Sequence, residues 1–411
     1  MNHTTRRTFL AGAAGASLAG LAGCADEAVD GNYEIWGADQ GTNTIYIHEP
    51  DGNGGFEEID EIDTGAEGGE VPHMVDYTTD YEYAAVACTA GARTLVYRTE
   101  DRELVANLET GAGSHFAGFS PDDEFIHVDV IGEEEIVRVD ADLENESFEQ
   151  VDSIDLRENE TVLDAGIEDG SPICHQYAQD GRSLHTIGPS YHDAALVVVD
   201  HDDFSVDRAY SGEEIPTNCG TVPHPTEEKF YLTAGLPSDP DADPDEDPVA
   251  ADGVGDFYVY DTAEDEVTTV ESTRGVDAHG FWFTPDGEEL WVLNRETNDG
   301  LIIDPDTDEV LEEIDAFGPE QSDDPGESDA PDIMWASPDG EYMFVTTRGP
   351  NPLSGDPHAA TGINPGYAVF DIESRERVDM VQPDADNPDS DFHGIGVRPT
   401  GDADGFTSPP Y

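Results

Sequence analysis

The stretch HGFWFTPDG (His279–Gly287) decides the fold, because its pattern returns elsewhere in the chain. A short apolar run leads into a Ser/Thr-Pro-Asp-Gly turn, and a second β-rich run follows the turn. The other copies are DIMWASPDG (Asp332–Gly340), HFAGFSPDD (His115–Asp123) and HGIGVRPTG (His393–Gly401). Such a recurrence indicates an architecture built from repeated units.

Each unit contains four short strands. The second strands are Leu290–Leu293, Tyr342–Thr346 and Phe125–Val128, and the third strands, which end in Asp, are Leu301–Asp304, Tyr367–Asp371 and Ile136–Asp140. Fourth strands, such as Glu309–Ile314 and Arg377–Val381, close the units. Four short strands joined by tight turns are typical of a β-propeller blade.

Counting the first strands predicts an all-β fold with seven blades. They occur at His73, His115, Ile173–His175, Cys219, His279, Asp332 and His393. The last of them has no partner strands after it, whereas Tyr33–Gly37, Thr44–His48 and Glu57–Ile62 have the pattern of second, third and fourth strands. We therefore expect both chain ends to close blade seven, because an open ring would leave two exposed sheet edges.

The units resemble the YVTN-repeat, lactonase-like family of seven-bladed propellers over about residues 32–405. The resemblance rests on the Ser/Thr-Pro-Asp-Gly turn, the β-run after it and the third strand ending in Asp. The YVTN tetrapeptide itself is not matched, and blades three and four depart most, with Gln179–Gly181 and Pro225–Glu227 at the turn. The family includes enzymes, cofactor-bearing proteins and binding scaffolds, so the resemblance implies an architecture and no single activity.

The net charge of the chain narrows the range of functions that it can have. The 411 residues include 95 Asp+Glu against 16 Lys+Arg, a net charge of −79, with Lys229 as the one lysine. A nucleic-acid binder needs a basic surface and is excluded. The hydrophobic fraction of 36% supports a core, so the charge does not indicate disorder. Evenly spread acid with almost no lysine is typical of an extreme halophile's protein; an acidic calcium-storage protein is the alternative.

The N-terminus has the pattern of an export signal. Arg6 and Arg7 precede the apolar run Ala11–Leu21, which resembles a twin-arginine signal, and LAGC (Leu21–Cys24) resembles a lipoprotein cleavage box. We expect residues 1–23 to be the signal peptide, 24–31 a linker lipidated at Cys24, and 32–411 a single propeller. This predicts a haloarchaeal-type lipoprotein on the outer face of the cytoplasmic membrane; an uncleaved anchor would also place the propeller outside.

A ring of potential metal ligands lies six residues before the Pro position of the turns. Equal offset means equal height on equivalent inner strands, so these side chains should meet at one end of the channel. In blade three this position is Ile173, and a short bulge would bring Cys174 or His175 into place. Such donors suit Zn²⁺ or copper better than Ca²⁺, which prefers oxygen ligands. The ring residues are His73, His115, His175, Cys219, His279, Asp332 and His393. A ring inherited by duplication and purely structural is the alternative.

Loops on the same face supply candidate ligand-binding residues. The Gly/Pro-rich loop 349–366 carries His358, and the acidic run Pro237–Asp256 is either a solvated loop or a Ca²⁺ site. Arginines on this face would clamp a carboxylate or phosphate, or pair with local acids. They are Arg93, Arg274, Arg295 and Arg348.

Three functions follow as hypotheses. The first is a lipid-anchored binding propeller that holds a metal ion or a small anionic ligand at the channel mouth. The second is a metal-dependent hydrolase or oxidase, lactonase-like, at the same ring, and the third is a scaffold for a protein partner. The sequence has no haem-attachment, zincin or phosphate-loop motif. Cys174 and Cys219 should lie within disulfide reach or both face the channel, and Cys88 should be buried alone.

Overall fold

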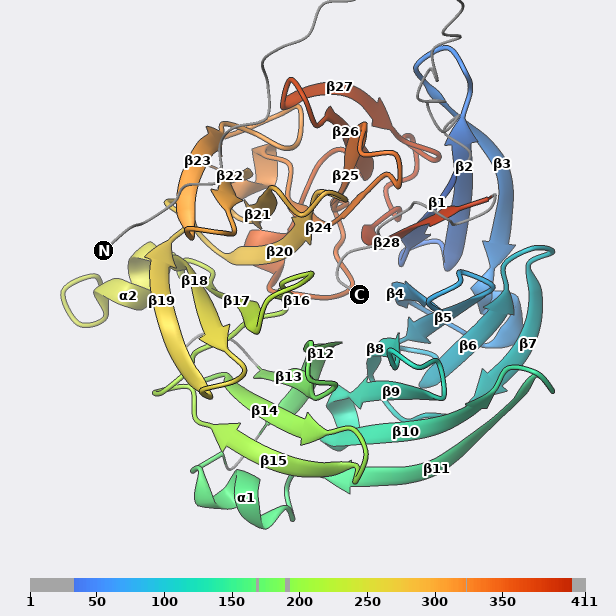
Figure 1. Cartoon of the computed structure of the whole chain (residues 1–411). Coiled ribbons are helices and arrows are strands. Elements are labelled where there is room, and N and C mark those ends of the chain that lie inside the picture. Colours follow the sequence, from blue (N-terminus) through green and yellow to red (C-terminus); the bar gives the residue numbers. More distant parts are fainter. Residues whose placement is uncertain (1–32, 168–169, 189–192, 323, 401–411) are drawn as a thin grey trace, which may run out of the picture. The chain divides into compact units, whose positions relative to one another are not determined.

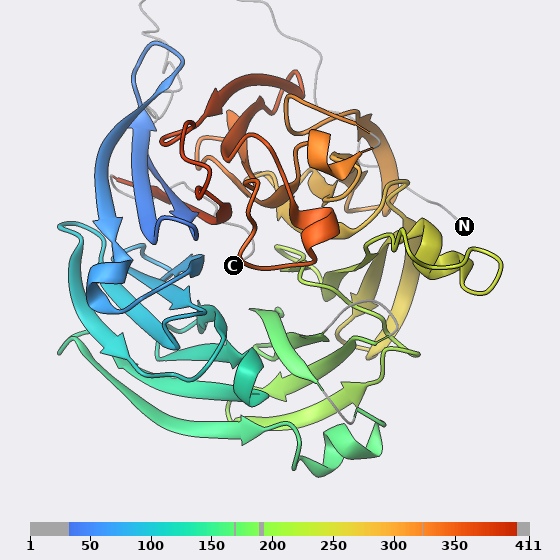
Figure 2. The same ribbon diagram turned by 180° about the vertical axis from the view of Figure 1, so that it is seen from behind.

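The computed structural model describes residues 33–400 except 168–169, 189–192 and 323. The predicted signal peptide, Cys24 and residues 401–411 lie outside the described residues. Within the described part, the strands form seven four-stranded sheets arranged as a ring, which confirms the seven-bladed β-propeller (Figure 1). Figure 2 shows the ring from behind.

Every blade is an antiparallel sheet whose strands follow one another from the channel outwards. Blade one contains β4 (Pro72–Tyr77), β5 (Tyr83–Cys88), β6 (Arg93–Arg98) and β7 (Glu103–Leu108); blade two contains β8 (Ser114–Phe119), β9 (Phe125–Val130), β10 (Glu135–Asp142) and β11 (Ser147–Asp155); blade three contains β12 (Ser171–Tyr177), β13 (Ser183–Gly188), β14 (Ala195–Asp200) and β15 (Ser205–Tyr210). Blade four contains β16 (Thr221–Pro223), β17 (Lys229–Leu236), β18 (Val254–Asp261) and β19 (Glu266–Ser272); blade five contains β20 (Ala278–Phe283), β21 (Leu290–Asn294), β22 (Asp299–Asp304) and β23 (Glu309–Ile314); blade six contains β24 (Pro331–Ala336), β25 (Tyr342–Thr347), β26 (Gly366–Asp371) and β27 (Glu376–Val381).

Helices are short and lie in the connections. They are η1 (Thr64–Glu67), η2 (Ile131–Glu133), α1 (Glu160–Asp164), α2 (Pro248–Asp252), η3 (Pro325–Glu327) and α3 (Pro357–Ala360). None of these helices of the described chain has the length and apolar character needed to cross a membrane.

Both chain ends build blade seven, as predicted. The inner strand β28 (Phe392–Pro399) pairs with β1 (Tyr33–Asp39), and β2 (Thr44–Pro50) and β3 (Phe56–Asp63) complete the sheet. The register sets Tyr33 opposite Pro399 and Trp36 opposite Gly396. This pairing joins the first and last described strands, so blade seven is a complete four-stranded sheet.

The repeated turn has a clear local chemistry. In blade five, Gly287 has φ 69°, a left-handed conformation that glycine adopts without strain. Its N–H donates to the Thr284 carbonyl at 2.8 Å, and Asp286 accepts from the Thr284 hydroxyl at 2.7 Å. Blade six repeats this arrangement at Ser337–Gly340, whereas Asp123 takes the glycine position in blade two with φ 58°. The motif therefore fixes where the first strand ends.

A β-bulge near the start of the inner strand turns one residue of the blade toward the channel. Pairing is interrupted between Pro72 and Met74 in blade one, and at the equivalent places in blades two, three, five, six and seven. The first residue inside each bulge is the one that the equal offset selected. These residues are His73, His115, Ile173, His279, Asp332 and His393.

Candidate functional site

Five of the seven ring residues line a cavity of about 910 Å³ at one end of the channel. His73, His115, His279, His393 and Cys219 form part of its wall, as the equal offset predicted. Asp332 is fully buried and contacts two of these histidines. The structure therefore brings the predicted set together, except His175. The role of these residues as metal ligands stays a prediction.

Two ring histidines are oriented by the next blade. Nδ1 of His115 donates to the Ile173 carbonyl at 2.8 Å, and Nδ1 of His393 donates to the His73 carbonyl at 3.1 Å. In both cases the acceptor is the backbone of the equivalent bulge residue one blade further on. A carbonyl can only accept, so Nδ1 carries the proton and Nε2 keeps its lone pair. This is the tautomer that a metal ligand needs.

His73 has the opposite tautomer. The Gln40 side-chain oxygen accepts from Arg348 at 3.3 Å and from Ser354 at 2.9 Å, so the Gln40 amide nitrogen donates to Nδ1 of His73. Nε2 of His73 then carries a hydrogen and, among the described residues, has no partner. The ring of His73 stacks on that of His393, with centroids 3.7 Å apart. His73 is thus arranged as a hydrogen-bond donor to a ligand.

Asp332 joins two blades around one point. Its Oδ1 lies 2.9 Å from Nε2 of His279, and its Oδ2 lies 3.7 Å from Nε2 of His393. The three ligand atoms are all within 4.8 Å of one another. The 2.9 Å contact lacks hydrogen-bond direction, so both nitrogens of His279 and Oδ1 of Asp332 have no hydrogen-bond partner among the described residues. Unpaired buried polar atoms of this kind suit a bound cation.

Two arginines hold the Asp332 carboxylate in place. Arg348 donates through Nη1 to Asp332 at 2.5 Å and through Nε to Asp391 at 2.8 Å. Arg295 donates to Asp277 at 2.7 Å and has Nη1 3.5 Å from Asp332. Three buried carboxylates therefore face two guanidiniums, and the cluster lacks one positive charge. A bound metal ion or a protonated histidine would supply it.

The pKa shifts of these residues favour the presence of a compensating positive charge beside Asp332. Burial alone would raise the pKa of Asp332, but His393 and Arg348 hold it well below its ordinary value. Burial and Arg295 lower the pKa of His279, yet Asp332 and Cys219 together outweigh them and raise it to about 9. Burial lowers the pKa values of His73, His115 and His393. The neutral imidazoles are ready to coordinate, and His279 carries the compensating proton.

Two long loops form the cavity rim. The Ser238 hydroxyl lies 3.1 Å from Nε2 of His358 and donates to Glu296 at 2.5 Å. This contact links the loop before α2 to the loop that carries α3, and both loops line the cavity. His358 therefore lies on the rim of the cavity, and its role as a ligand-binding residue stays a prediction.

The predicted arginines separate into two groups. Arg295 lines the cavity, and Arg348 lies fully buried behind it. Arg93 pairs with Glu109 at 3.1 Å, and Arg274 pairs with Glu313, and neither lines the cavity. A ligand role for these two stays a prediction, and their observed partners are local acids.

His175 is placed differently from the prediction. The bulge in β12 leaves Ile173 at the ring and points Cys174 toward Cys219, with Sγ atoms 2.7 Å apart. This confirms that adjacent blades bring these cysteines together; Cys88 is buried apart from them and free, as predicted. Because successive residues of a strand face opposite sides, His175 turns into the interface with blade two.

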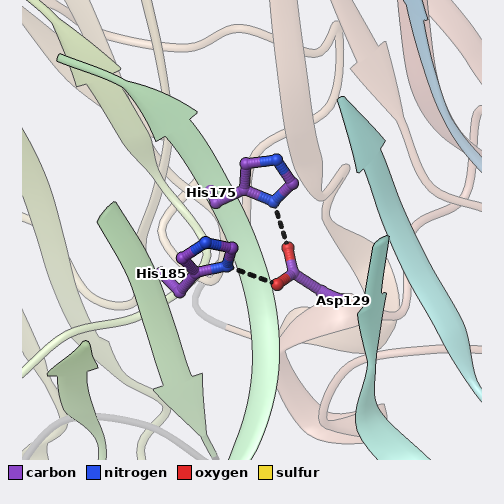
Figure 3. Close-up of side chains that lie close together, drawn as sticks. All are labelled: Asp129, His175 and His185. Carbon is purple, nitrogen blue, oxygen red and sulfur yellow. Dashed lines mark hydrogen bonds and ion pairs between the residues drawn. The ribbon is translucent and has the colours of Figure 1, made fainter. Parts of the chain in front are cut away.

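There His175 joins a second buried cluster (Figure 3). Nδ1 of His175 and Nδ1 of His185 lie 2.6 Å and 2.7 Å from the two oxygens of Asp129, and all three side chains are fully buried. The two imidazoles stack with centroids 4.4 Å apart. Both donate through Nδ1–H, so each carboxylate oxygen is satisfied. The tautomers thus fit an inter-blade hydrogen-bond cluster better than metal ligation through Nδ1.

Asp129, His185 and Gln40 are site residues that were not predicted from the sequence. Asp129 and His127 alternate along β9 and face one side of the blade, which is the signal in the sequence. Equal offsets relate residues of first strands only, so they do not reveal a cluster that also takes residues from second strands.

Replacing Asp129 by alanine is expected to lower the free energy of unfolding by roughly 2–5 kcal/mol, because two buried N–H groups lose their acceptor. Asp129→Asn should cost less, since His185 can change tautomer and donate through Nε2 to Ser183, 2.9 Å away. Chemical denaturation measures both. Metal content should be unchanged in the two variants; a loss would show that this cluster holds the metal.

Comparisons with known proteins agree with the fold. No protein-family model and no curated protein matches the sequence. A protein from Lactobacillus plantarum matches in structure with a TM-score of 0.60 at 12% identity, over 89% of this chain and 99% of that chain. Kuenenia stuttgartiensis hydrazine synthase matches with a TM-score of 0.51 at 13% identity, over 74% and 77%. Dihydro-heme d1 dehydrogenase NirN, in complex with DHE, matches with 0.51 at 13%, over 88% and 74%.

At these identities the similarity supports the fold alone. The chain is a seven-bladed β-propeller with a histidine-lined cavity at one end of its channel.

Proposed function

We propose that the propeller binds a divalent transition-metal ion, zinc or copper, through His279, Asp332 and His393. The observation that carries this proposal is that each of these three buried residues places one ligand atom within 4.8 Å of the others. Among the described residues, both nitrogens of His279 and Oδ1 of Asp332 have no hydrogen-bond partner. The donor set of two imidazoles and a carboxylate leaves positions open for a further ligand. A calcium ion is disfavoured by the two nitrogens.

The open positions suit a small anionic ligand. Arg295 lines the cavity beside the proposed metal site, and so does His73, whose Nε2–H has no partner among the described residues. A carboxylate or phosphate that binds the metal would also accept hydrogen bonds from these two donors. A metal-dependent hydrolase or oxidase at the same ring is the second candidate, because the cavity opens directly onto His279 and His393.

Metal analysis of protein purified without a histidine tag tests the proposal. We expect one zinc or copper ion per chain, and a rise in the melting temperature when zinc is added to chelator-treated protein. Metal-free protein that zinc does not stabilise would favour the third function, a scaffold for a protein partner.

Metal binding at pH 7 is expected to release about one proton per ion, because the raised pKa of His279, about 9, keeps it protonated in the free protein. The affinity should rise about tenfold per pH unit below pH 9 and level off above it. Calorimetry in buffers of different ionisation enthalpy measures the released protons. An affinity independent of pH between 7 and 9 would exclude His279 as a ligand.

We also propose export and a lipid anchor at Cys24, in a halophilic, haloarchaeal-type relative of the YVTN-repeat, lactonase-like propellers. The support is the twin-arginine pattern, the LAGC box, the repeated turn and the net charge of −79.

Replacing Cys24 by serine should release the protein from the membrane fraction into the medium, because the acceptor of the lipid is lost. Arg6→Lys together with Arg7→Lys should retain the precursor inside the cell. Cell fractionation with an antibody measures both. A Cys24→Ser protein that stays with the membrane would show that the apolar run is an uncleaved anchor.

A further inference from the structure

Two thiols meet next to the cavity, at the boundary between blades three and four. Cys174 belongs to β12 and Cys219 lies two residues before β16, and their Sγ atoms are 2.7 Å apart. Both thiols are free, and neither residue is more than 5% exposed. Cys219 lines the cavity, whereas Cys174 does not. One sulfur is thus reached from the cavity, and the second stands behind it.

The backbones around both cysteines are fixed. The N–H of Cys174 donates to the Thr186 hydroxyl at 3.3 Å, and that hydroxyl donates back to the Cys174 carbonyl at 3.2 Å. The N–H of Cys219 donates to the Asn218 side chain at 2.8 Å, and the N–H of Gly220 donates to Thr233 at 2.9 Å. A disulfide needs its sulfur atoms at about 2.05 Å, and the two Sγ atoms are already 2.7 Å apart.

We propose that Cys219 and Cys174 form a redox-active pair that exchanges with small disulfides entering the cavity. This activity goes beyond the proposed metal binding and does not depend on it. The thiolate of Cys219 attacks one sulfur of a disulfide RSSR; the S–S bond breaks, Cys219–S–S–R forms, and the expelled RS⁻ takes up the proton that Cys219 lost.

The thiolate of Cys174 then attacks Sγ of Cys219. The Cys174–Cys219 bond forms, the bond to the R group breaks, and a second RS⁻ leaves and takes up the proton of Cys174. In sum, two protein thiols are oxidised and one RSSR is reduced to two RSH. The order of the two attacks follows from the cavity, which exposes Cys219 alone. A cavity of about 910 Å³ lies in the size range of small-molecule sites.

Oxidised glutathione is the probe, applied to the full chain after chelator treatment. Alkylation under denaturing conditions followed by mass spectrometry should show that the oxidised protein has lost two reactive thiols and contains a Cys174–Cys219 cross-linked peptide. Reduced glutathione should restore both thiols. Chelation removes the metal, so a failed metal proposal leaves this result unaffected. Three unaltered propeller thiols after oxidation would overturn the proposal, as would a disulfide that reduced glutathione does not reopen.

Single variants test the order of attack. Cys174→Ser should accumulate the mixed disulfide with glutathione on Cys219, because the resolving thiol is absent. Cys219→Ser should react at least about tenfold more slowly, because Cys174 is not reached from the cavity. Cys88→Ser is the matched control and should react like the wild type, and circular dichroism verifies that each variant is folded. Equal rates for Cys174→Ser and Cys219→Ser would contradict the assigned roles.

Discussion

Replacing His279 and His393 together by alanine is expected to abolish stoichiometric zinc binding while the seven blades stay folded. Each residue is the first one in a bulge; its ring lines the cavity, and the residues that flank the bulge pair with the neighbouring strand of the blade. Loss of an outer hydrogen-bond partner alone costs about 10–100-fold in metal affinity, so loss of two direct ligands should cost more than about 100-fold. Metal analysis and zinc titration measure the effect.

Two controls make this result specific. His224→Gln changes a histidine at the far end of its blade, where Nδ1 accepts from Glu227 at 3.0 Å, and zinc binding should be unaffected. His115→Ala removes a ring member outside the three-ligand group and should retain an ion. If the double variant binds zinc as the wild type does, the convergence of His279, Asp332 and His393 is structural and the scaffold function is favoured.

The fold could be predicted because each blade repeats the same local chemistry. The polar groups of the turn at Thr284–Gly287 form hydrogen bonds with one another. Every blade that forms this turn therefore shows the same sequence pattern. Because the sequence pattern predicts no partner strands after the one at His393, pairing with Tyr33–Gly37 follows from the need to close the ring.

The site could be predicted only where it obeys the repeat. His73, His115 and His393 share one offset and one bulge, and the structure gathers them at the cavity. His175 breaks the rule because the bulge in β12 places Ile173 at the ring, a choice that depends on backbone pairing. Gln40, whose amide fixes the tautomer of His73, directly follows β1, the second strand of blade seven. It is 33 residues away from His73 in the sequence.

Arginine placement shows the same limit. Face and loop position selected four arginines together, but the side chain of Arg348 turns inward and that of Arg274 pairs with exposed Glu313. In a chain with so many carboxylates, almost any arginine finds a local acid. Only three-dimensional packing decides whether an arginine and its acid are buried together or stay exposed to solvent.

Replacing Arg348 by methionine is expected to lower the free energy of unfolding by about 3–5 kcal/mol, because it leaves two buried carboxylates without their shared cation. Arg348 is fully buried and bonds Asp332 and Asp391 at once, at 2.5 Å and 2.8 Å. Arg274→Met is the matched control; its partner Glu313 is exposed, so the change should cost no more than about 1 kcal/mol. Chemical denaturation of chelator-treated protein measures both.

Zinc should restore part of the stability lost in Arg348→Met. An ion held by His279, Asp332 and His393 returns positive charge to Asp332, so zinc should stabilise this variant more than it stabilises the wild type. Asp391 keeps hydrogen bonds from the N–H groups of Gly349 and Leu353, at 3.2 Å and 2.8 Å, so its share of the loss remains. If zinc stabilises both proteins equally, Asp332 is not a ligand and serves only to hold the arginines. A difference that disappears in Arg348→Met combined with His279→Ala and His393→Ala would link the buried ion pair to the metal site.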